Sequence, residues 1–324
     1  MNRIAVIAII LSTIAIAGEV FIFATTKEQD DDVMRSAIEN DYRVYPPVIP
    51  DKVDFAGERV PLEEYYVRES LDRELTAVMY LQSSTSLIMK RAGRFFPEIE
   101  KILRENGVPE DFKYLCVAES GLTNATSPAK AQGFWQFIES TGKKYGLHID
   151  DDIDMRNDVT AATRAACQYL KQLYSEFGSW TSAAAAYNCG ENGLHKRMER
   201  EQCDSYYDVR LNTETSRYVF RILAYKIILQ DPIHYGFHIR KCDLYPPLPY
   251  RTIKIKGQNI DLYNIARAND CTYKILRAYN PWITTDKIVN RDNLQYTIKL
   301  PTVNGTKMKT LTKGSKDTSF IEKM

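Results

Sequence analysis

Apolar residues recur at helical spacing through most of the chain, and this constrains its fold more than any other feature. Between residues 69 and 235 no segment alternates convincingly in the way a half-buried strand does. In one stretch Phe95, Ile99 and Leu103 share a helix face. The pattern predicts a mainly α domain over residues 69–240.

The residue pattern changes after the proline-rich stretch "YPPLPYR", which is typical of a linker. Beyond it "RTIKIKG" alternates as a strand does, two short helical segments follow, and "LQYTIKLP" predicts a closing strand. This order predicts a small β-α-α-β module over residues 250–302 and a polar tail over 303–324. Before the helical domain, residues 27–68 are polar and are expected to form a linker or arm with little regular structure.

The N-terminus has the pattern of an export signal. A basic start at Arg3 precedes an apolar run from Ile4 to Ala17, and the run resumes after Glu19. We expect residues 1–26 to be either a cleaved signal peptide or a retained membrane anchor, because the total apolar length suits both.

Composition excludes some functions. Lysine and arginine total 43 against 42 aspartates and glutamates, so charge gives no reason to expect nucleic acid as a partner. With four histidines and no CxxC pair, we expect no metal site. The pairing of the six cysteines stays open, and buried free thiols are the alternative for Cys116 and Cys167.

One carboxylate stands out in the stretch "YLCVAESG". Phe112, Leu115, Cys116 and Glu119 fall on one helix face, and Gly121 marks the helix end. A buried carboxyl without a cation has a raised pKa, and a general acid needs a proton near neutral pH. The alternative is a helix-end glutamate that turns to solvent.

Five motifs, in order along the chain, carry a family resemblance. They are Glu119-Ser120-Gly121, "SPAKAQGFWQF" (127–137), "DMRNDVTAATRAACQYLKQLYSEFGSW" (154–180), "AAAAYNCGENG" (183–193) and "ETSRYVFRILA" (214–224). The chain resembles lytic transglycosylases of the membrane-bound lytic murein transglycosylase D type, with a lysozyme-like helical catalytic domain. It departs from their pattern at Cys189 and Asn192, where the family more often has alanine and glycine.

The resemblance implies a role for each matching residue. Glu119 would be the single catalytic acid/base. The substrate-binding residues would be Ser120, Gly133, Gln136, Tyr187, Asn188 and Tyr218. Of these, Tyr187 and Asn188 would orient Glu119 and contact substrate, Tyr218 would hydrogen-bond near Glu119, and Gly133 would allow a close backbone approach.

The resemblance also implies a reaction. The bond between N-acetylmuramic acid and N-acetylglucosamine in peptidoglycan would be cleaved without water, metal or cofactor, leaving a 1,6-anhydro end. The protein would act in the periplasm of the bacterial cell envelope. A goose-type lysozyme-like hydrolase is one alternative, and it predicts a second carboxylate within residues 150–158. A non-catalytic wall-binding scaffold is the other.

The C-terminal module resembles a LysM domain, a small binder of N-acetylglucosamine polymers. "IKGQNIDLYNIARAN" and "ILRAYNP" carry this resemblance, but the family's Gly-Asp-Thr turn is missing after Gly257. The module is therefore expected either to bind glycan or to be a structural appendage.

Overall fold

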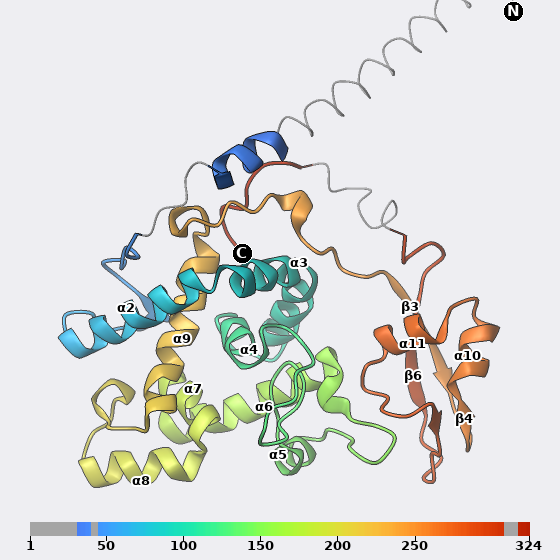
Figure 1. Ribbon diagram of the computed structural model, residues 1–324. Helices are drawn as coiled ribbons and strands as arrows, with labels where there is room; N and C mark the ends of the chain where they lie inside the picture. Colours follow the sequence, from blue (N-terminus) through green and yellow to red (C-terminus); the bar gives the residue numbers. More distant parts are fainter. Residues whose placement is uncertain (1–30, 40–44, 308–316) are drawn as a thin grey trace, which may run out of the picture. The chain divides into compact units, whose positions relative to one another are not determined.

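A computed structural model describes residues 31–39, 45–307 and 317–324 (Figure 1). The chain divides into a small unit, residues 1–46 with 317–319, and a large unit that holds the rest. In the small unit residues 31–39 are helical, and the expected signal or anchor over residues 1–26 lies outside the described residues. No described helix has the length and apolar character needed to cross a bilayer.

The first part of the large unit is helical, as predicted. Its elements are β1 (Asp54–Phe55), β2 (Glu58–Arg59), α2 (Tyr65–Tyr80), α3 (Gln82–Glu105), α4 (Phe112–Ser120), α5 (Glu139–Lys144), α6 (Val159–Phe177), α7 (Trp180–Cys189), α8 (Glu191–Glu201) and α9 (Thr213–Gln230). Four single 3₁₀ turns join them: Met155–Asn157, Tyr206–Asp208, Ile233–Tyr235 and Lys241–Asp243.

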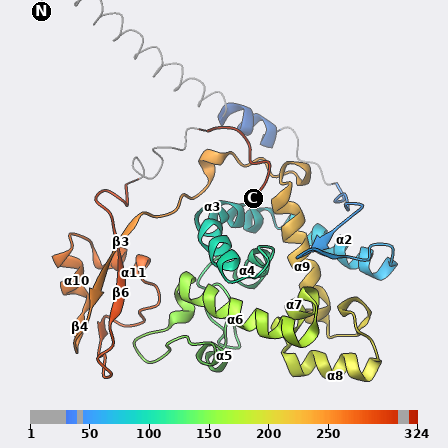
Figure 2. The same ribbon diagram turned by 180° about the vertical axis from the view of Figure 1, so that it is seen from behind.

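Helix α9 is apolar around most of its circumference and runs through the core of this domain. It packs against α2, α4 and α7, while α3 lies against α4 and α6 (Figures 1 and 2). The contact with α7 is close because Ala183 to Ala186 are completely buried. The helix that carries Glu119 is therefore held on several sides.

The segment before α2 packs against the helical core, which fits the arm alternative of the predicted linker or arm. Phe55 is fully buried in the helical core, and the Ala56-Gly57 turn joins β1 to β2 with both φ angles positive. The Glu58 carboxylate accepts hydrogen bonds from the Trp180 and Thr181 amides at 2.6 and 2.9 Å, so it caps the start of α7. Residues 47–62 have little regular structure beyond the two-residue strands β1 and β2, whereas residues 31–39 and 65–68, also within the expected linker or arm, are helical.

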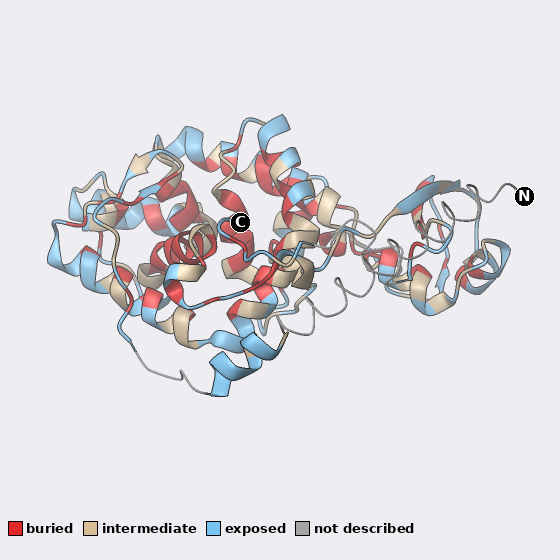
Figure 3. Cartoon of the chain, turned by 90° about the horizontal axis from the view of Figure 1, so that it is seen from above, coloured by how far each residue is buried: buried red, intermediate tan, exposed pale blue. Residues whose placement is uncertain are grey.

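The C-terminal module has its own small core, separate from the helical one (Figure 3). Its elements are β3 (Tyr250–Ile255), β4 (Ile260–Asp261), α10 (Leu262–Ala268), α11 (Tyr273–Tyr279), β5 (Lys287–Ile288) and β6 (Tyr296–Pro301). Strands β3 and β6 pair antiparallel with Tyr250 opposite Pro301. The predicted β-α-α-β order is present, with a second short pair, β4 and β5, added to it.

The acidic loop at residues 150–154 joins the module to the helical domain. Ile153 is fully buried in the core of the module. The Asp152 carboxylate accepts from the Val289 amide at 2.8 Å and from the Thr285 hydroxyl at 3.1 Å. The loop is therefore not a solvated turn, because it binds residues more than 130 positions away in the sequence.

Replacing Asp152 with alanine is expected to loosen this contact. The Val289 amide would lose its acceptor, a change worth about 1–3 kcal/mol locally. Hydrogen exchange followed by mass spectrometry should show faster exchange in peptides covering residues 281–290. The matched control is Asp151→Ala, because the Asp151 side chain is exposed and the hydrogen bond from Thr284 of the module goes to the Asp151 backbone carbonyl. Equal exchange in the two variants would contradict the role given to Asp152.

Candidate active site

Glu119 lies in the last turn of α4, which ends at Gly121 in the left-handed conformation, as the sequence predicted. The Glu119 carboxyl is half-buried, and the hydroxyl of Tyr218 donates a hydrogen bond to its Oε1. The pKa of Glu119 is raised from 4.5 to about 7, mainly by burial. The hydrogen bond from Tyr218 and the charge of Arg221 oppose the rise, whereas the charge of Glu214 adds to it.

Tyr218 is brought to Glu119 by α9. Its ring is buried, and its pKa is held well above the ordinary value by burial and by the Glu119 charge. The hydroxyl therefore keeps its proton and acts as a donor to the carboxyl. Glu214 stands one turn earlier on α9, so the i, i+4 spacing places it on the same helix face as Tyr218.

The end of α7 supplies Tyr187 and Asn188. The Tyr187 hydroxyl donates to the Trp135 carbonyl at 2.7 Å, which ties the loop before α5 to α7. Burial raises the pKa of Tyr187 well above its ordinary value, and the nearby Glu119 charge adds to the rise. Asn188 accepts from the Thr215 hydroxyl at 2.9 Å, and its amide nitrogen lies 3.5 Å from a Glu214 oxygen.

Gln136 belongs to the tight turn before α5. Its side-chain amide donates to the carbonyls of Ala125 at 2.9 Å and Gly133 at 2.8 Å. Both amide hydrogens are thus engaged within the loop, and the side-chain carbonyl oxygen is the atom left to accept a bond from a ligand.

Gly133 and Ser120 have local contacts of their own. A Cβ on Gly133 would lie 1.9 Å from the Arg156 carbonyl oxygen, so the close approach that this glycine allows is to the protein's own backbone. The Ser120 hydroxyl donates to the Cys116 carbonyl one turn earlier in α4, at 3.2 Å. Ser120 is half-buried beside Glu119, and its oxygen retains acceptor capacity.

Comparison with known proteins matches two parts of the chain to domain families. Residues 96–209 match the transglycosylase SLT domain, and residues 251–304 match the soluble lytic transglycosylase C-terminal LysM-like domain. The chain carries a transglycosylase SLT domain. The resemblance drawn from the five motifs is confirmed, and so is the LysM-like module.

The chain is also similar to curated proteins. The chain is 32% identical over 198 residues to membrane-bound lytic murein transglycosylase D of Escherichia coli K12, and it shows the same identity to that of strain O6:H1. The alignment covers 58% of this chain and 43% of each relative, so the chain spans less than half the length of these curated relatives. Tyr218 lies beyond the residues that match the SLT domain.

Two of the carboxylates within residues 150–158, where a hydrolase would need one, are engaged elsewhere in the SLT domain. Asp154 pairs with Arg156 at 2.6 Å, and both side chains are buried. Asp158 caps α6 by accepting from the Ala161 amide at 2.8 Å. The carboxylate that acts electrostatically on Glu119 is Glu214, to which the sequence analysis gave no role. Its place four residues before Tyr218 is the signal that could have revealed it.

The remaining site expectations concern cysteines and metals. No disulfide joins the six cysteines, all of which are described, and Cys116 and Cys167 are buried as the thiol alternative predicted. Within the described ranges, no group of three or more His, Cys, Asp or Glu side chains is placed to hold a metal ion. The expectation that no metal is needed stays a prediction.

Proposed function

We propose that this chain is a peptidoglycan lytic transglycosylase with Glu119 as its only acid/base. The observation that carries the proposal is a half-buried carboxyl in an SLT domain, with a pKa of about 7 and a tyrosine donor on one oxygen. Because Tyr218 donates to Oε1, the proton of the neutral acid resides on Oε2, the oxygen that would face the glycosidic bond.

The reaction follows from one carboxyl acting twice. Glu119 gives its proton to the glycosidic oxygen between N-acetylmuramic acid and N-acetylglucosamine, and the bond to the anomeric carbon breaks. The muramic N-acetyl group stabilises that carbon. The ionised Glu119 then takes the proton of the C6 hydroxyl, whose oxygen closes the 1,6-anhydro ring. The proton returns to Glu119 and no water is consumed.

The supporting residues have narrower roles in this proposal. Gln136 accepts a hydrogen bond from the sugar, since only its carbonyl oxygen is uncommitted. Ser120 and Asn188 also bind substrate. Tyr187 acts through the Trp135 loop that it ties to α7. In this proposal the substrate lies in the cell envelope, and residues 1–26 export the chain or anchor it to the membrane.

Product mass tests the proposal. The soluble part of the chain, from about residue 30, would be incubated with purified peptidoglycan and the released muropeptides weighed. Products that end in 1,6-anhydromuramic acid, one water lighter than hydrolysis products, are expected. Reducing-end products would favour the lysozyme-like hydrolase, with Glu214 as the carboxylate to examine. Binding without release would favour the scaffold.

Replacing Glu214 with glutamine is expected to shift the pH profile. Its negative charge raises the pKa of Glu119, so removing it lowers that pKa, and the protonated acid is lost at lower pH. The alkaline limb of kcat/KM should move down by about half a pH unit or more. Glu191→Gln is the control, because Glu191 contacts Gln172 and is not among the charges acting on Glu119. An unmoved limb in Glu214→Gln would contradict the coupling.

A further inference from the structure

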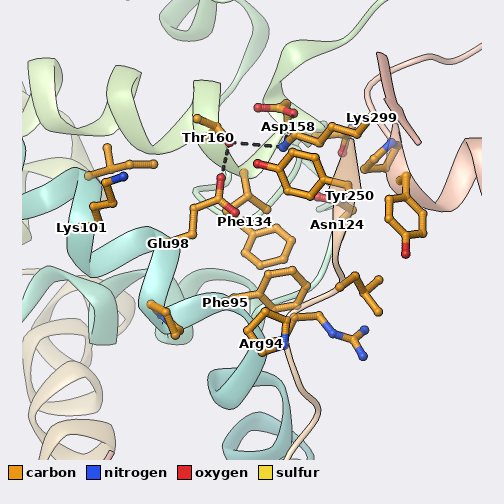
Figure 4. A pocket seen from close by; sticks show the side chains of 18 of the residues that line it. Arg94, Phe95, Glu98, Lys101, Asn124, Phe134, Asp158, Thr160, Tyr250 and Lys299 are labelled. Carbon is orange, nitrogen blue, oxygen red and sulfur yellow. Dashed lines mark hydrogen bonds and ion pairs between the residues drawn. The ribbon is translucent and has the colours of Figure 1, made fainter. Parts of the chain in front are cut away.

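A cavity of about 600 Å³ lies where the SLT domain meets the LysM-like module (Figure 4). The SLT domain contributes the face of α3 from Arg94 to Glu105, the start of α6, and the loop residues Asn124 and Phe134. The module contributes residues of the linker, β3, α11 and β6. None of the seven proposed site residues lines the cavity. Its volume is in the range of small-ligand sites.

The cavity has an apolar wall. Phe95 and Phe134 meet edge to face with ring centroids 4.7 Å apart, and Leu248 and Tyr279 complete the surface. Phe95 is only half-buried, so part of an aromatic ring faces open space. Phe134 follows Gly133 in the loop that also carries Gln136, so this one loop borders both the cavity and the proposed active site.

The acidic side chains of the cavity are all engaged. Glu98 accepts a hydrogen bond from the Thr160 hydroxyl, and Lys299 lies 3.3 Å from the same hydroxyl (Figure 4). Asp158 caps α6 and lies 3.5 Å from Lys299. Glu105 lies 3.9 Å from Lys101 in the same helix. Because these three carboxylates have partners, they repel an anionic ligand in the cavity less than unpaired carboxylates would.

Two of the four cationic side chains have no carboxylate partner within the described part of the chain. Arg94 donates to the Pro246 carbonyl at 3.0 Å and lies over the Tyr245 ring, and burial lowers the pKa of its guanidinium. Arg164 is exposed on α6 and makes no ion pair. A half-buried guanidinium without a counter-charge is costly, and an anionic ligand would relieve that cost.

We propose that this cavity binds the peptide stem of peptidoglycan. A stem offers free carboxylates to Arg164 and Arg94 and small alkyl groups to the Phe95–Phe134 wall, which together match the chemistry of the cavity. The inference rests on the proposed function, since it names the part of the substrate that lies beside the cleaved glycan. Residues of both domains would then select the glycan strands that carry peptide stems.

The test is calorimetric titration of the full chain with the stem tripeptide alanyl-D-glutamyl-diaminopimelate, which contains no glycan. Binding is expected, and Arg164→Glu should weaken it about tenfold. Lys171→Glu is the matched control, with the same charge change at an exposed position of α6 outside the cavity. A tripeptide with amidated carboxylates should also bind the unaltered chain about tenfold more weakly. No binding, or equal loss in both variants, would overturn the inference.

Cleavage assays separate this inference from the proposed function. Arg164→Glu should lower kcat/KM on peptide-bearing strands about tenfold and leave peptide-free strands unaffected. Tripeptide binding without any glycan cleavage would refute the transglycosylase but keep the peptide site. Cleavage with equal kcat/KM on both kinds of strand, and no tripeptide binding, would refute the site alone.

Discussion

Replacing Glu119 with glutamine is expected to lower the rate of anhydromuropeptide release by about 10³-fold or more. Removing one general acid typically costs 10²–10⁴-fold, and here the same group also serves as the base. The amide keeps the size of the side chain, and its carbonyl oxygen can still accept from Tyr218. The loss would therefore be chemical rather than structural, and muropeptide release measured by chromatography would quantify it.

The same substitution is expected to stabilise the fold above neutral pH. The pKa of Glu119 is higher in the folded chain, about 7 against 4.5, so the folded state binds more protons between these values. The contribution of Glu119 to the free energy of unfolding is fully present below pH 4.5 and is lost as the pH rises through 7. At pH 8 Glu119→Gln should unfold with a free energy about 1–3 kcal/mol higher than the unaltered chain, with no difference at pH 4.

Thermal unfolding at the two pH values checks this second effect. Glu139→Gln is a suitable control, because the exposed Glu139 pairs with Lys143 and has a lowered pKa, so its loss cannot stabilise the chain at high pH in the same way. If Glu119→Gln is inactive but has the same free energy of unfolding as the unaltered chain at both pH values, the Glu119 carboxyl is not held in a desolvated site. Full activity would remove the assignment altogether.

Local patterns predicted the helices and the half-buried glutamate because their signals lie within one or two turns. The face shared by Phe112, Cys116 and Glu119 already places the carboxyl inward, and Gly121 ends the helix as expected. Tyr218 needed the family resemblance, since one tyrosine in an apolar helix is ordinary core. Its contact with Glu119 joins residues 99 positions apart, a separation that periodicity does not address.

Other parts were missed because their partners are remote. The run of aspartates at residues 150–154 is typical of a solvated turn, yet Ile153 is buried in the module and Asp152 binds it. Glu214 stands in the first turn of α9, where an acidic residue normally complements the helix dipole. Its effect on Glu119 depends on how α9 crosses α4, which no local pattern encodes.

Replacing Gly133 with alanine is expected to destabilise the fold by about 3–5 kcal/mol. The new Cβ would lie 1.9 Å from the Arg156 carbonyl oxygen and 2.7 Å from its carbon, and neither backbone atom can turn aside as a side chain could. The φ angle of +80° adds a steric cost of about 1 kcal/mol for any residue with a Cβ. The melting temperature should fall by about 10 °C or more.

Gly146→Ala separates the two contributions. Gly146 has a similar φ of +83°, but nothing lies within 4 Å of the position of its Cβ, so this control carries only the conformational cost. Equal losses of stability in Gly133→Ala and Gly146→Ala would show that the backbone around Arg156 can move away from the new Cβ. A larger loss at Gly133 would show that the loop holding Gln136 is fixed against the Asp154–Arg156 pair, so the shape of the proposed active site depends on a buried ion pair outside it.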